Sequence, residues 1–550
     1  MNTLPLHQTD GYKVDHRSQY PEGTELVFSN FTPRSTQYMH KVDGITDEKI
    51  VVFGLQYFVR WFVCEEFKKN FFKQPKKRVI QKYVRRINGY LGEGKVNFEH
   101  VEALHDLGYL PIAIYGLPEG TVTKAKIPHV VIENTVPGFF WLTNYFETVM
   151  SCMLWKPATS ATTARNYRKI LEHYCRETGG DLGFVKFQGH DFSFRGMSGL
   201  QDAQMSGAGH LLSFVGTDTI PAIDFLEDYY YANCEKELVG CSVPATEHSV
   251  MCMGSKENEI DTFKRLINDI YPNGIVSIVS DTWNYWRVIS EFLVDLKEDI
   301  LKRDGKTTIR PDSGCPVEVI TGKSITLSEF HSAKDLQKAY NAGFKYIRIK
   351  NDYHEIIEGS LQEYGYVKLK EAFPVWSLSV QEYAEMEGSI QAMWDIFGGT
   401  INEKEFKVLD SHIGLIYGDS ITLQRAKDIL ERLKLKGFCS TNVVLGIGSY
   451  TYEYCTRDTL GWAMKATAGV VKSEFREIYK DPKTDNGTKK SARGWLAVFK
   501  DEDGEYILED QTTRERFENC EFRLVYKNGC FCSYPYETLE IIRKRIEQTL

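Results

Sequence analysis

The sequence lacks the features that direct a chain into or across a membrane. Its start, "MNTLPLHQTDGYKVDH", contains no apolar core of signal-peptide length. The most apolar stretch, "VVFGLQYFVRWFVC", carries Arg60 and is too short to span a bilayer. We therefore expect a cytoplasmic protein with no membrane partner.

Cysteine motifs and the common nucleotide-binding fingerprints are also missing. The chain has 12 cysteines but no C-x-x-C pair, and the nearest two, Cys530 and Cys532, are expected on one face of a strand. This pattern indicates reduced, buried thiols in a cytosolic protein rather than a disulfide framework or a zinc site. No P-loop and no G-x-G-x-x-G follows a predicted strand.

The chain has no excess of positive charge. With 67 basic and 75 acidic residues its formal net charge is −8, which argues against a general nucleic-acid binder. The one basic stretch with interleaved aromatics, "KKNFFKQPKKRVIQKYVRR", is better explained as the solvated face of a surface helix. At 550 residues, 42% of them hydrophobic, the chain is long enough for more than one domain.

Short apolar runs alternate with amphipathic helical patterns from about residue 185 to 450. The strand-like runs are "VKFQGHDF", "HLLSFVGTD", "GCSVPATEH", "GIVSIVSDT", "KTTIRPDSG", "SHIGLIYGDS" and "NVVLGIGS". The clearest helical patterns cover residues 284–301 and 423–433. Parallel neighbours need a crossover helix, so this alternation predicts an α/β fold with an irregular, TIM-like β/α barrel.

The two ends of the chain have a different pattern. "RGWLAVFKDEDGEYILED" and "FRLVYKNGCFCSYP" each place two strand-like runs around an Asp-Gly or Asn-Gly turn, which is typical of hairpins. We expect residues 1–150 and 460–550 to form a second, mostly antiparallel β domain that contributes to a dimer and to the site. The barrel would then cover 151–459, with an insertion at about 353–405 where no clear period is found.

Each strand-like run of the barrel ends in residues that are able to bind a ligand. These are Asp191, Asp218, His248, Asp281, Arg310 with Asp312, Asp419, and Gly448 with Ser449. Because the carboxyl ends of the strands in a barrel face the same side, we expect these residues to surround one site.

The motif "IRPDSG" offers a guanidinium and a carboxylate two residues apart. Arg310 is suited to phosphate or carboxylate, and Asp312 to sugar hydroxyls or to a hard cation such as Mg²⁺. The alternative is an internal Arg–Asp pair that seals the barrel mouth. The glycine turns "GDS" and "GIGSY" follow the last two strands, where barrel enzymes often bind phosphate.

Other strand-end residues suggest a flat ring beside an anion. Phe192 and Arg195 in "HDFSFRG" offer a stacking platform and a cation. His248 follows Glu247 and has either a structural or a catalytic role. Asp218 in "FVGTDT" either caps a turn or holds a ligand. Together these residues suit a phosphorylated sugar and a planar acceptor.

Several motifs, in this order, resemble the nicotinamide phosphoribosyltransferase family from about residue 8 to 540, apart from the stretch before 405. They are "TDGYKVDHRSQYP", "VFGLQY", "WLTNYFET", "HDFSFRG", "GTDT", "SVPATEHS", "SDT", "IRPDSG", "YGDS", "TRD" and "VYKNG". The resemblance implies transfer of a phosphoribosyl group from 5-phosphoribosyl 1-pyrophosphate to nicotinamide in NAD salvage. It also implies a homodimer with shared active sites, Mg²⁺, and ATP as a coupling co-substrate.

The same resemblance implies roles for individual residues. The nicotinamide ring stacks on Phe192, is covered by Tyr12 of the other subunit, and lies near Asp218 and Arg310. The remaining roles are pyrophosphate binding by Arg195, His248 and Arg310; ribose binding by Asp312 with Mg²⁺ near Asp281 and Asp312; and ribose or 5′-phosphate binding by Gly418, Asp419, Gly448, Ser449 and Arg457. His248, Asp281 and Asp312 are the catalytic candidates, with His248 transiently phosphorylated by ATP.

Asp218 is the residue that favours nicotinamide over nicotinate. In the family this carboxylate accepts a hydrogen bond from the carboxamide NH₂, and it would repel the carboxylate of nicotinate. Phe187, Ser420 and Ser449 stand where family members carry tyrosine, glycine and glycine. The alternatives are a nicotinate phosphoribosyltransferase, a barrel glycoside hydrolase and a non-catalytic binding protein.

Overall fold

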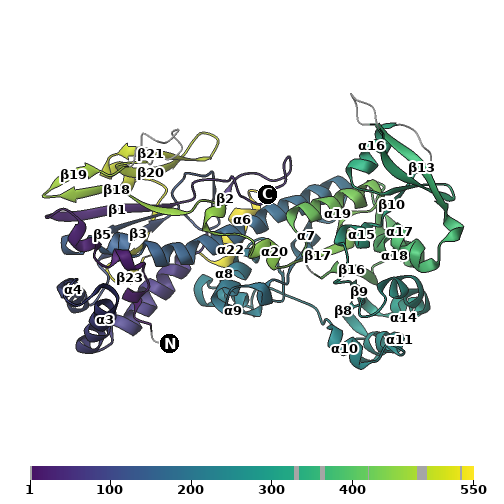
Figure 1. The fold of residues 1–550 in the computed structure, drawn as a ribbon, viewed down its shortest axis with the longest axis horizontal. Helices are drawn as coiled ribbons and strands as arrows, with labels where there is room; N and C mark the ends of the chain where they lie inside the picture. The colour runs from purple at the N-terminus through teal and green to yellow at the C-terminus, as the bar shows by residue number, and fades with distance from the viewer. Residues whose placement is uncertain (1–2, 328–332, 360–365, 419, 480–491, 533–535) are drawn as a thin grey trace.

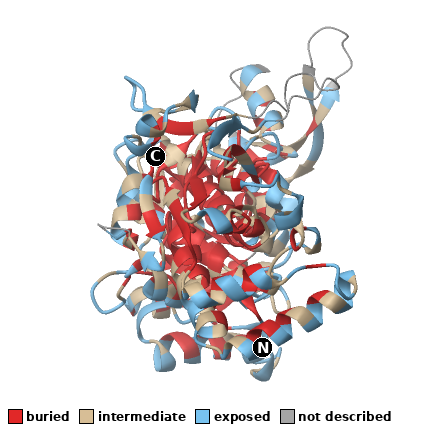
Figure 2. Ribbon diagram, turned by 90° about the vertical axis from the view of Figure 1, so that its left-hand side faces the viewer, coloured by how far each residue is buried: buried red, intermediate tan, exposed pale blue. Residues whose placement is uncertain are grey.

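The protein is an elongated α/β molecule with an antiparallel sheet towards one end and a parallel sheet towards the other (Figure 1). The computed structural model describes residues 3–327, 333–359, 366–418, 420–479, 492–532 and 536–550. A long helix, α6 (Glu147–Thr178), runs between the two ends. Buried residues fill the interior and exposed residues cover the outside (Figure 2).

The parallel sheet brings the strands of the central region side by side. In spatial order they are β7 (Gly216–Thr217), β6 (Gly189–Asp191), β17 (Val443–Ile447), β16 (Ile413–Tyr417), β9 (Asp304–Arg310) and β8 (Asn273–Val279). In this register Asp191 pairs with Thr217, and Arg310 pairs with Val279. The α/β class with a parallel central sheet is confirmed, and the carboxyl ends of the six strands share one edge.

Helical segments follow these strands, as the alternating pattern predicts. They are α8 (Leu200–His210), α9 (Ile220–Tyr230), α10 (His248–Met253), α11 (Glu259–Lys264), η7 (Arg265–Ile270), α12 (Tyr285–Arg287), η8 (Val288–Phe292), α13 (Leu293–Asp295), α14 (Lys297–Lys302), α15 (Pro316–Thr321), α19 (Leu423–Leu435) and α20 (Ser449–Tyr452). The helical prediction for 284–301 is confirmed by the run from α12 to α14, and that for 423–433 by α19. In α19 the apolar stripe, including Ile429 and Leu433, is buried.

Two of the expected strands are much shorter than the sequence suggests. The first half of the run "VKFQGHDF" ends the helix α7 (Leu182–Gln188), and only the three residues of β6 are strand. The run "HLLSFVGTD" ends α8 and keeps two strand residues in β7. Short apolar runs fit a buried helix as well as a strand, so periodicity alone does not separate the two.

The run "GCSVPATEH" is not a strand, which corrects the sequence prediction. Instead, two isolated parallel bridges connect this segment to the edge strands, one from Cys241 to Gly216 of β7 and one from Ala245 to Ser277 of β8. Pro244 lies between the two bridges and has no N–H to donate to a ladder. The segment therefore contacts both edges of the sheet without joining it as a regular strand.

Both chain ends contribute to one antiparallel sheet. Its strands in spatial order are β19 (Glu474–Glu477), β18 (Ala463–Val471), β1 (Thr24–Thr32), β5 (Val130–Asn134), β3 (Ile112–Gly116), β22 (Arg523–Lys527) and β23 (Cys530–Phe531). The two hairpin predictions are confirmed: β20 (Trp495–Lys500) pairs with β21 (Tyr506–Thr512), and β22 pairs with β23. Asn528 and Gly529, at the second turn, both have positive φ, as a tight hairpin turn requires.

The remaining helices surround this sheet or connect it to the rest of the chain. They are η1 (Pro5–His7), η2 (Gly11–Lys13), α1 (His16–Gln19), α2 (Leu55–Tyr57), η3 (Phe58–Glu66), η4 (Lys68–Phe72), α3 (Lys76–Leu91), α4 (Glu99–Leu107), η5 (Pro137–Phe139), α5 (Leu142–Tyr145), η11 (Arg457–Thr459), α21 (Arg514–Glu518) and α22 (Leu539–Glu547). A further short pair joins β2 (Ile50–Val51) to β4 (Val122–Thr123).

Helix α6 takes part in two hydrophobic cores. Its first half, including Met150 and Leu154, packs in the core that also contains the antiparallel sheet. Its second half, including Tyr167 and Leu171, packs in the core under the parallel sheet. Within the described residues no helix, α6 included, is both long enough and apolar enough to cross a membrane.

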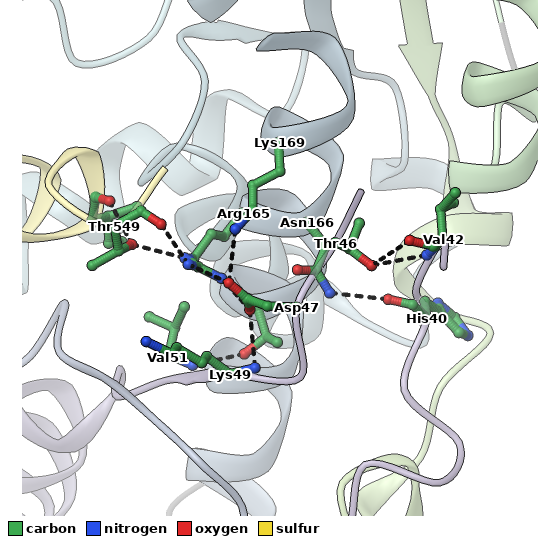
Figure 3. Close-up of polar contacts among 12 residues, drawn as sticks. His40, Val42, Thr46, Asp47, Lys49, Val51, Arg165, Asn166, Lys169 and Thr549 are labelled. Carbon is green, nitrogen blue, oxygen red and sulfur yellow. Dashed lines mark hydrogen bonds and ion pairs between the residues drawn. The ribbon is translucent and has the colours of Figure 1, made fainter. Parts of the chain in front are cut away.

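A buried ionic cluster ties α6 to segments from both ends of the sequence (Figure 3). Arg165 of α6 is 1% exposed and forms a bidentate pair with Asp47 at 2.8 and 2.9 Å. Its remaining donors reach the hydroxyl and the carbonyl of Thr549 at 2.8 and 2.7 Å. Lys169, one turn further along α6, also contacts Asp47 at 2.8 Å. Paired guanidinium and carboxylate groups are favourable here because the bidentate ion pair is joined by further hydrogen bonds to Thr549.

The region between β9 and β16 forms a lobe with its own small sheet. Its strands are β10 (Ser324–Leu327), β11 (Tyr346–Ile349), β12 (Asp352–Gly359) and β13 (Tyr366–Pro374), with α16 (Ala333–Asn341) beside them; α17 (Val380–Glu387), α18 (Ser389–Phe397), β14 (Gly399–Ile401) and β15 (Lys407–Leu409) follow. Lys436, just after α19, is buried and donates to the carbonyls of Thr321, Ser324 and Glu387. Burial lowers the pKa of Lys436 to about 8.

The twelve cysteines are all free thiols. Only Cys175 and Cys439 are buried, whereas Cys530 and four others are exposed. The expectation that these thiols are buried is therefore wrong for most of them.

Candidate active site

The carboxyl edge of the parallel sheet brings together strand-end residues that are far apart in the sequence. On the β6 side, the Phe192 N–H donates to the carbonyl of Ile447 at 2.9 Å. The Asp218 N–H donates to the carbonyl of Asp191, also at 2.9 Å. The loops after β17, β6 and β7 are thus bonded to one another in that order.

On the β8 side the edge is organised around the carboxylate of Asp281. Its Oδ1 lies 3.1 Å from Nε2 of His248, and its Oδ2 accepts a hydrogen bond from the Asp312 N–H at 2.9 Å. The side chain of Asp281 is 2% exposed, whereas that of His248 is 48% exposed. Burial alone would raise the pKa of Asp281. Hydrogen bonds, the largest from Ser313, outweigh burial and lower that pKa.

Glycines allow the loops after β9, β16 and β17 to approach each other closely. The Gly418 N–H donates to the carbonyl of Pro311 at 3.0 Å. A Cβ on Gly418 would lie 1.7 Å from Oδ1 of Asp312, so any side chain there would displace that carboxylate. A Cβ on Gly446 would lie 2.4 Å from the carbonyl of Tyr417. Asp419, which the sequence predicts as a ribose or phosphate ligand, lies outside the described residues.

The loop that carries Arg195 packs against the loop after β17. A Cβ on Gly196 would lie 2.3 Å from Oγ of Ser449, so the two turns are in direct contact. Gly448 precedes Ser449 as the residue before helix α20. Arg195 itself is exposed on the short turn η6 (Phe194–Gly196). This contact connects the loop after β17 to the loop after β6, so neighbouring loops touch one another along the whole edge from β8 to β7.

Arg310 has donors to spare at this edge. One NH₂ group donates to the carbonyl of Thr246, and Nε is buried without a hydrogen-bond partner. Arg310 takes part in no ion pair between described residues, and its guanidinium hydrogen bond among them goes to a backbone carbonyl. A buried, unpaired N–H of a guanidinium is costly unless an anion or water satisfies it, and this suits a phosphate or carboxylate ligand.

Asp218 does not cap the helix that follows it. Its Oδ1 lies 2.9 Å from Nε2 of His190 and accepts a hydrogen bond from the Ser242 hydroxyl at 2.7 Å. Thr219 occupies the N-cap position of α9. The Asp218 side chain remains 44% exposed. Burial on its own raises the pKa of Asp218, but the hydrogen bond from His190 and smaller contributions from Ser242 and Arg310 lower it overall.

His190 is a site residue that sequence reasoning missed. Its ring lies 4.5 Å from the ring of Phe192, centroid to centroid, with the planes 34° apart. The alternation of side chains along a strand contained the necessary signal, because His190 and Phe192 are two residues apart and share one face. Phe192 itself is half-buried, so one part of its ring remains accessible.

The carboxylates of the edge suit a hard cation only in part. Across the described residues no group of three or more His, Cys, Asp or Glu side chains is placed to hold a metal ion. The backbone N–H of Asp312 donates to the carboxylate of Asp281, so the two residues lie side by side at this edge. Mg²⁺ commonly takes one or two carboxylates and completes its shell with substrate phosphates and water, so this pair fits a substrate-assisted site.

Two further expected site residues, Tyr12 and Arg457, are carried by short turns outside the parallel sheet. Tyr12, on η2, lines a pocket of about 480 Å³ beside the antiparallel sheet, together with Tyr20, Glu147 and Lys465. Arg457, on η11, pairs with the neighbouring Asp458 at 3.4 Å. No hydrogen bond or ion pair between described residues joins either side chain to the edge of the parallel sheet.

Comparison with known proteins places this arrangement among phosphoribosyltransferases. A model of the nicotinate phosphoribosyltransferase (NAPRTase) family matches residues 187–528, and a model of the nicotinamide phosphoribosyltransferase N-terminal domain matches residues 5–114. A protein from Acinetobacter baylyi named nicotinamide phosphoribosyltransferase is 48% identical, covering 99% of this chain and 97% of its own. One of the same name from Mycoplasma pneumoniae is 31% identical, covering 88% and 93%.

A solved structure shares the fold at low identity. The nicotinate-nucleotide pyrophosphorylase from Pyrococcus furiosus superposes with a TM-score of 0.53 at 12% identity, over 99% of this chain and 95% of that one. At this identity the likeness supports the fold alone.

Proposed function

Because this chain belongs to the nicotinate phosphoribosyltransferase (NAPRTase) family, we propose that it transfers the phosphoribosyl group of 5-phosphoribosyl 1-pyrophosphate to nicotinamide. The enzyme is a pentosyltransferase, a nicotinamide phosphoribosyltransferase, and its products are nicotinamide mononucleotide and pyrophosphate. The observation that carries the choice of nicotinamide is the carboxylate of Asp218, half-exposed at the edge of the sheet beside Phe192 and His190.

The acceptor ring needs positioning more than activation. The pyridine nitrogen carries a free lone pair, so no strong base is required, and stacking on Phe192 would hold it for attack on C1 of the ribose. The carboxamide would donate to Asp218. A carboxylate at this point repels nicotinate, so the same contact selects between the two acceptors.

The phosphoribosyl donor, 5-phosphoribosyl 1-pyrophosphate, would lie over the positively charged part of the edge. The unpartnered Nε of Arg310, with Arg195 and His248, would bind the pyrophosphate that leaves. The turns at Gly418 and Gly448, with Asp419, Ser449 and Arg457, would receive the ribose and its 5′-phosphate. Positive charge develops on the ribose ring as the C1–O bond breaks, and the Asp312 carboxylate would stabilise it.

We propose that Asp281 and Asp312 hold Mg²⁺ together with the diphosphate. When bound, the ion would neutralise charge on the leaving pyrophosphate. The low pKa of Asp281 keeps its carboxylate ionised at neutral pH. Asp281 also orients the imidazole of His248 through Nε2.

The second proposed role of His248 is to couple ATP hydrolysis to the transfer. Its side chain is 48% exposed and sits on an ionised carboxylate, which suits a nucleophilic imidazole. We expect His248→Ala to abolish stimulation of turnover by ATP while a basal rate remains, measured as nicotinamide mononucleotide formed with and without ATP. Full stimulation in this variant would remove His248 from the coupling step.

We propose that the active enzyme is a homodimer in which the Tyr12 pocket of one subunit faces the sheet edge of the other. This arrangement would explain why Tyr12 lies beside the antiparallel sheet in its own chain. A hybrid of Tyr12→Ala and Phe192→Ala subunits, isolated with two affinity tags, should recover about half of the wild-type activity, because one of its two sites would be intact. The two parent homodimers should both be weakly active, and a hybrid no better than they are would contradict shared sites.

The fold proposal extends beyond the six-stranded sheet. We propose that residues 241–245 close this sheet into an irregular, TIM-like barrel, because the segment bridges both edge strands. We also propose a cytoplasmic location, since all twelve cysteines are free thiols.

One assay tests the function directly. Nicotinamide and nicotinate are offered together with 5-phosphoribosyl 1-pyrophosphate and Mg²⁺, and the two mononucleotide products are separated and counted. Nicotinamide mononucleotide should dominate. Dominance of the nicotinate product would establish a nicotinate phosphoribosyltransferase, and no pyrophosphate release at all would indicate a binding protein.

A further inference from the structure

We propose that His190 and Ser242 are positioning residues that hold the Asp218 carboxylate in one orientation and so set the preference for nicotinamide. This inference rests on the proposed function, in which Asp218 accepts the carboxamide. Neither residue is expected to contact the reacting atoms. Their effect on the preference between the two acceptors would be exerted through Asp218.

Both donors reach the same oxygen of Asp218. His190 Nε2 lies 2.9 Å from Oδ1, and the Ser242 hydroxyl lies 2.7 Å from Oδ1. Among the described residues no side chain or backbone N–H donates to Oδ2. The carboxylate therefore keeps one oxygen with unused lone pairs, and at 44% exposure it is accessible to a ligand. A primary amide has two N–H donors and matches this acceptor.

The imidazole of His190 is itself held on two sides. The residue is 8% exposed, and its ring packs against Phe192 at 4.5 Å. Gly216 lies beside the ring as well, where a Cβ would come within 2.8 Å of Nδ1. The glycine therefore makes room for the ring, and the ring has little freedom to turn. Because an ionised carboxylate only accepts, the tautomer that fits the contact carries its proton on Nε2.

The orientation of Asp218 matters for selection as well as for binding. A carboxylate free to rotate could turn away from the carboxylate of nicotinate and so relieve the repulsion. Two hydrogen bonds to Oδ1 prevent that rotation, and Oδ2 remains directed at whichever acceptor is bound. Discrimination between an amide and a carboxylate at one contact requires an acceptor that cannot adapt to the wrong partner.

A matched pair of substitutions separates this role from a structural one. In His190→Gln the side-chain NH₂ can reach about as far as Nε2, whereas in His190→Asn it reaches only about as far as Nδ1. We expect His190→Asn to lower the ratio of kcat/KM for nicotinamide to that for nicotinate about ten- to a hundredfold. The change should lie mainly in KM for nicotinamide, with KM for phosphoribosyl pyrophosphate unchanged. His190→Gln should restore most of the ratio, and Ser242→Ala should lower it less than His190→Asn does.

A second variant covers the case in which His190→Asn does not fold. Gly216→Ala would push the imidazole from its place without altering any polar group, and it should lower the same ratio. Its control is Gly138→Ala, where a Cβ would meet nothing within 4 Å. Equal ratios in Gly216→Ala and Gly138→Ala would overturn the proposal.

The outcomes distinguish this inference from the proposed function. A wild-type enzyme that prefers nicotinate overturns the proposed function before any variant is compared. A wild-type preference for nicotinamide that persists in His190→Asn overturns only the positioning role. A fall in kcat for both acceptors by the same factor, with KM for nicotinamide unchanged and no rescue in His190→Gln, also overturns it, because that result describes a general structural defect.

Discussion

Replacing Arg310 by alanine is expected to lower kcat/KM for 5-phosphoribosyl 1-pyrophosphate about a hundred- to a thousandfold. A loss of this size is usual when one preorganised hydrogen-bond donor to a developing anion is removed. Its Nε is buried without a partner, so the guanidinium is placed for a ligand and not for an internal ion pair. The loss should be similar with either acceptor, because the pyrophosphate group is common to both reactions. The measurement is pyrophosphate release under saturating nicotinamide.

Two further variants serve as controls for this prediction. Arg310→Lys keeps the charge but not the planar fork of donors, so it should recover only part of the rate. Arg516→Ala removes an exposed guanidinium that pairs with Glu509 far from the site, and it should leave the rate unchanged. Full activity in Arg310→Ala would show that the leaving group is bound elsewhere.

Replacing Asp218 by serine is expected to lower the ratio of kcat/KM for nicotinamide to that for nicotinate by about a hundredfold or more. The variant loses a charged acceptor for the carboxamide and also the repulsion of the nicotinate carboxylate, and both losses change the ratio in the same direction. The measurement is initial rates with each acceptor alone at fixed phosphoribosyl pyrophosphate. The control is Asp106→Ser, which removes an exposed carboxylate paired with Lys76 on the surface.

The pH dependence of the same ratio offers an independent check. The pKa of Asp218 is lowered, because the hydrogen bonds from His190 and Ser242 together with the charge of Arg310 outweigh its burial. The group therefore stays ionised as the pH falls through the ordinary carboxyl range. Selectivity should persist in that range and be lost only at lower pH, as Asp218 becomes protonated. A ratio unaffected by Asp218→Ser at any pH would contradict the selectivity argument.

The convergence of the strand-end residues could be predicted because it follows from one property of parallel sheets. Strands of the same direction place their carboxyl ends on one side, so an acid or an arginine at each end must lie near the others. Their position after an apolar run was enough to predict this location for Asp191, Asp218, Asp281 and Arg310. The kinds of side chain that meet at this edge could therefore be predicted from the sequence alone.

The contacts that refine the site could not be predicted in this way. Ser242 donates to Asp218 from a segment that the sequence suggests is a strand, but Pro244 and the two isolated bridges leave it irregular. Position along a strand cannot indicate such a partner. Likewise, Tyr12 and Arg457 carry no local signal of where they lie relative to the sheet edge, because their placement depends on how the two halves of the molecule, and two copies of the chain, are arranged.

Helix α6 has a thermodynamic consequence. Because the same rod of backbone is buried in both cores, melting either core would leave part of it without its packing partners. The donor-binding half should therefore not survive loss of the half that carries Tyr12, and the two should unfold in one cooperative transition. A cavity made beside Leu154, in the core shared with the antiparallel sheet, would then also weaken the sheet edge, although Leu154 is none of the residues proposed to bind the sugar.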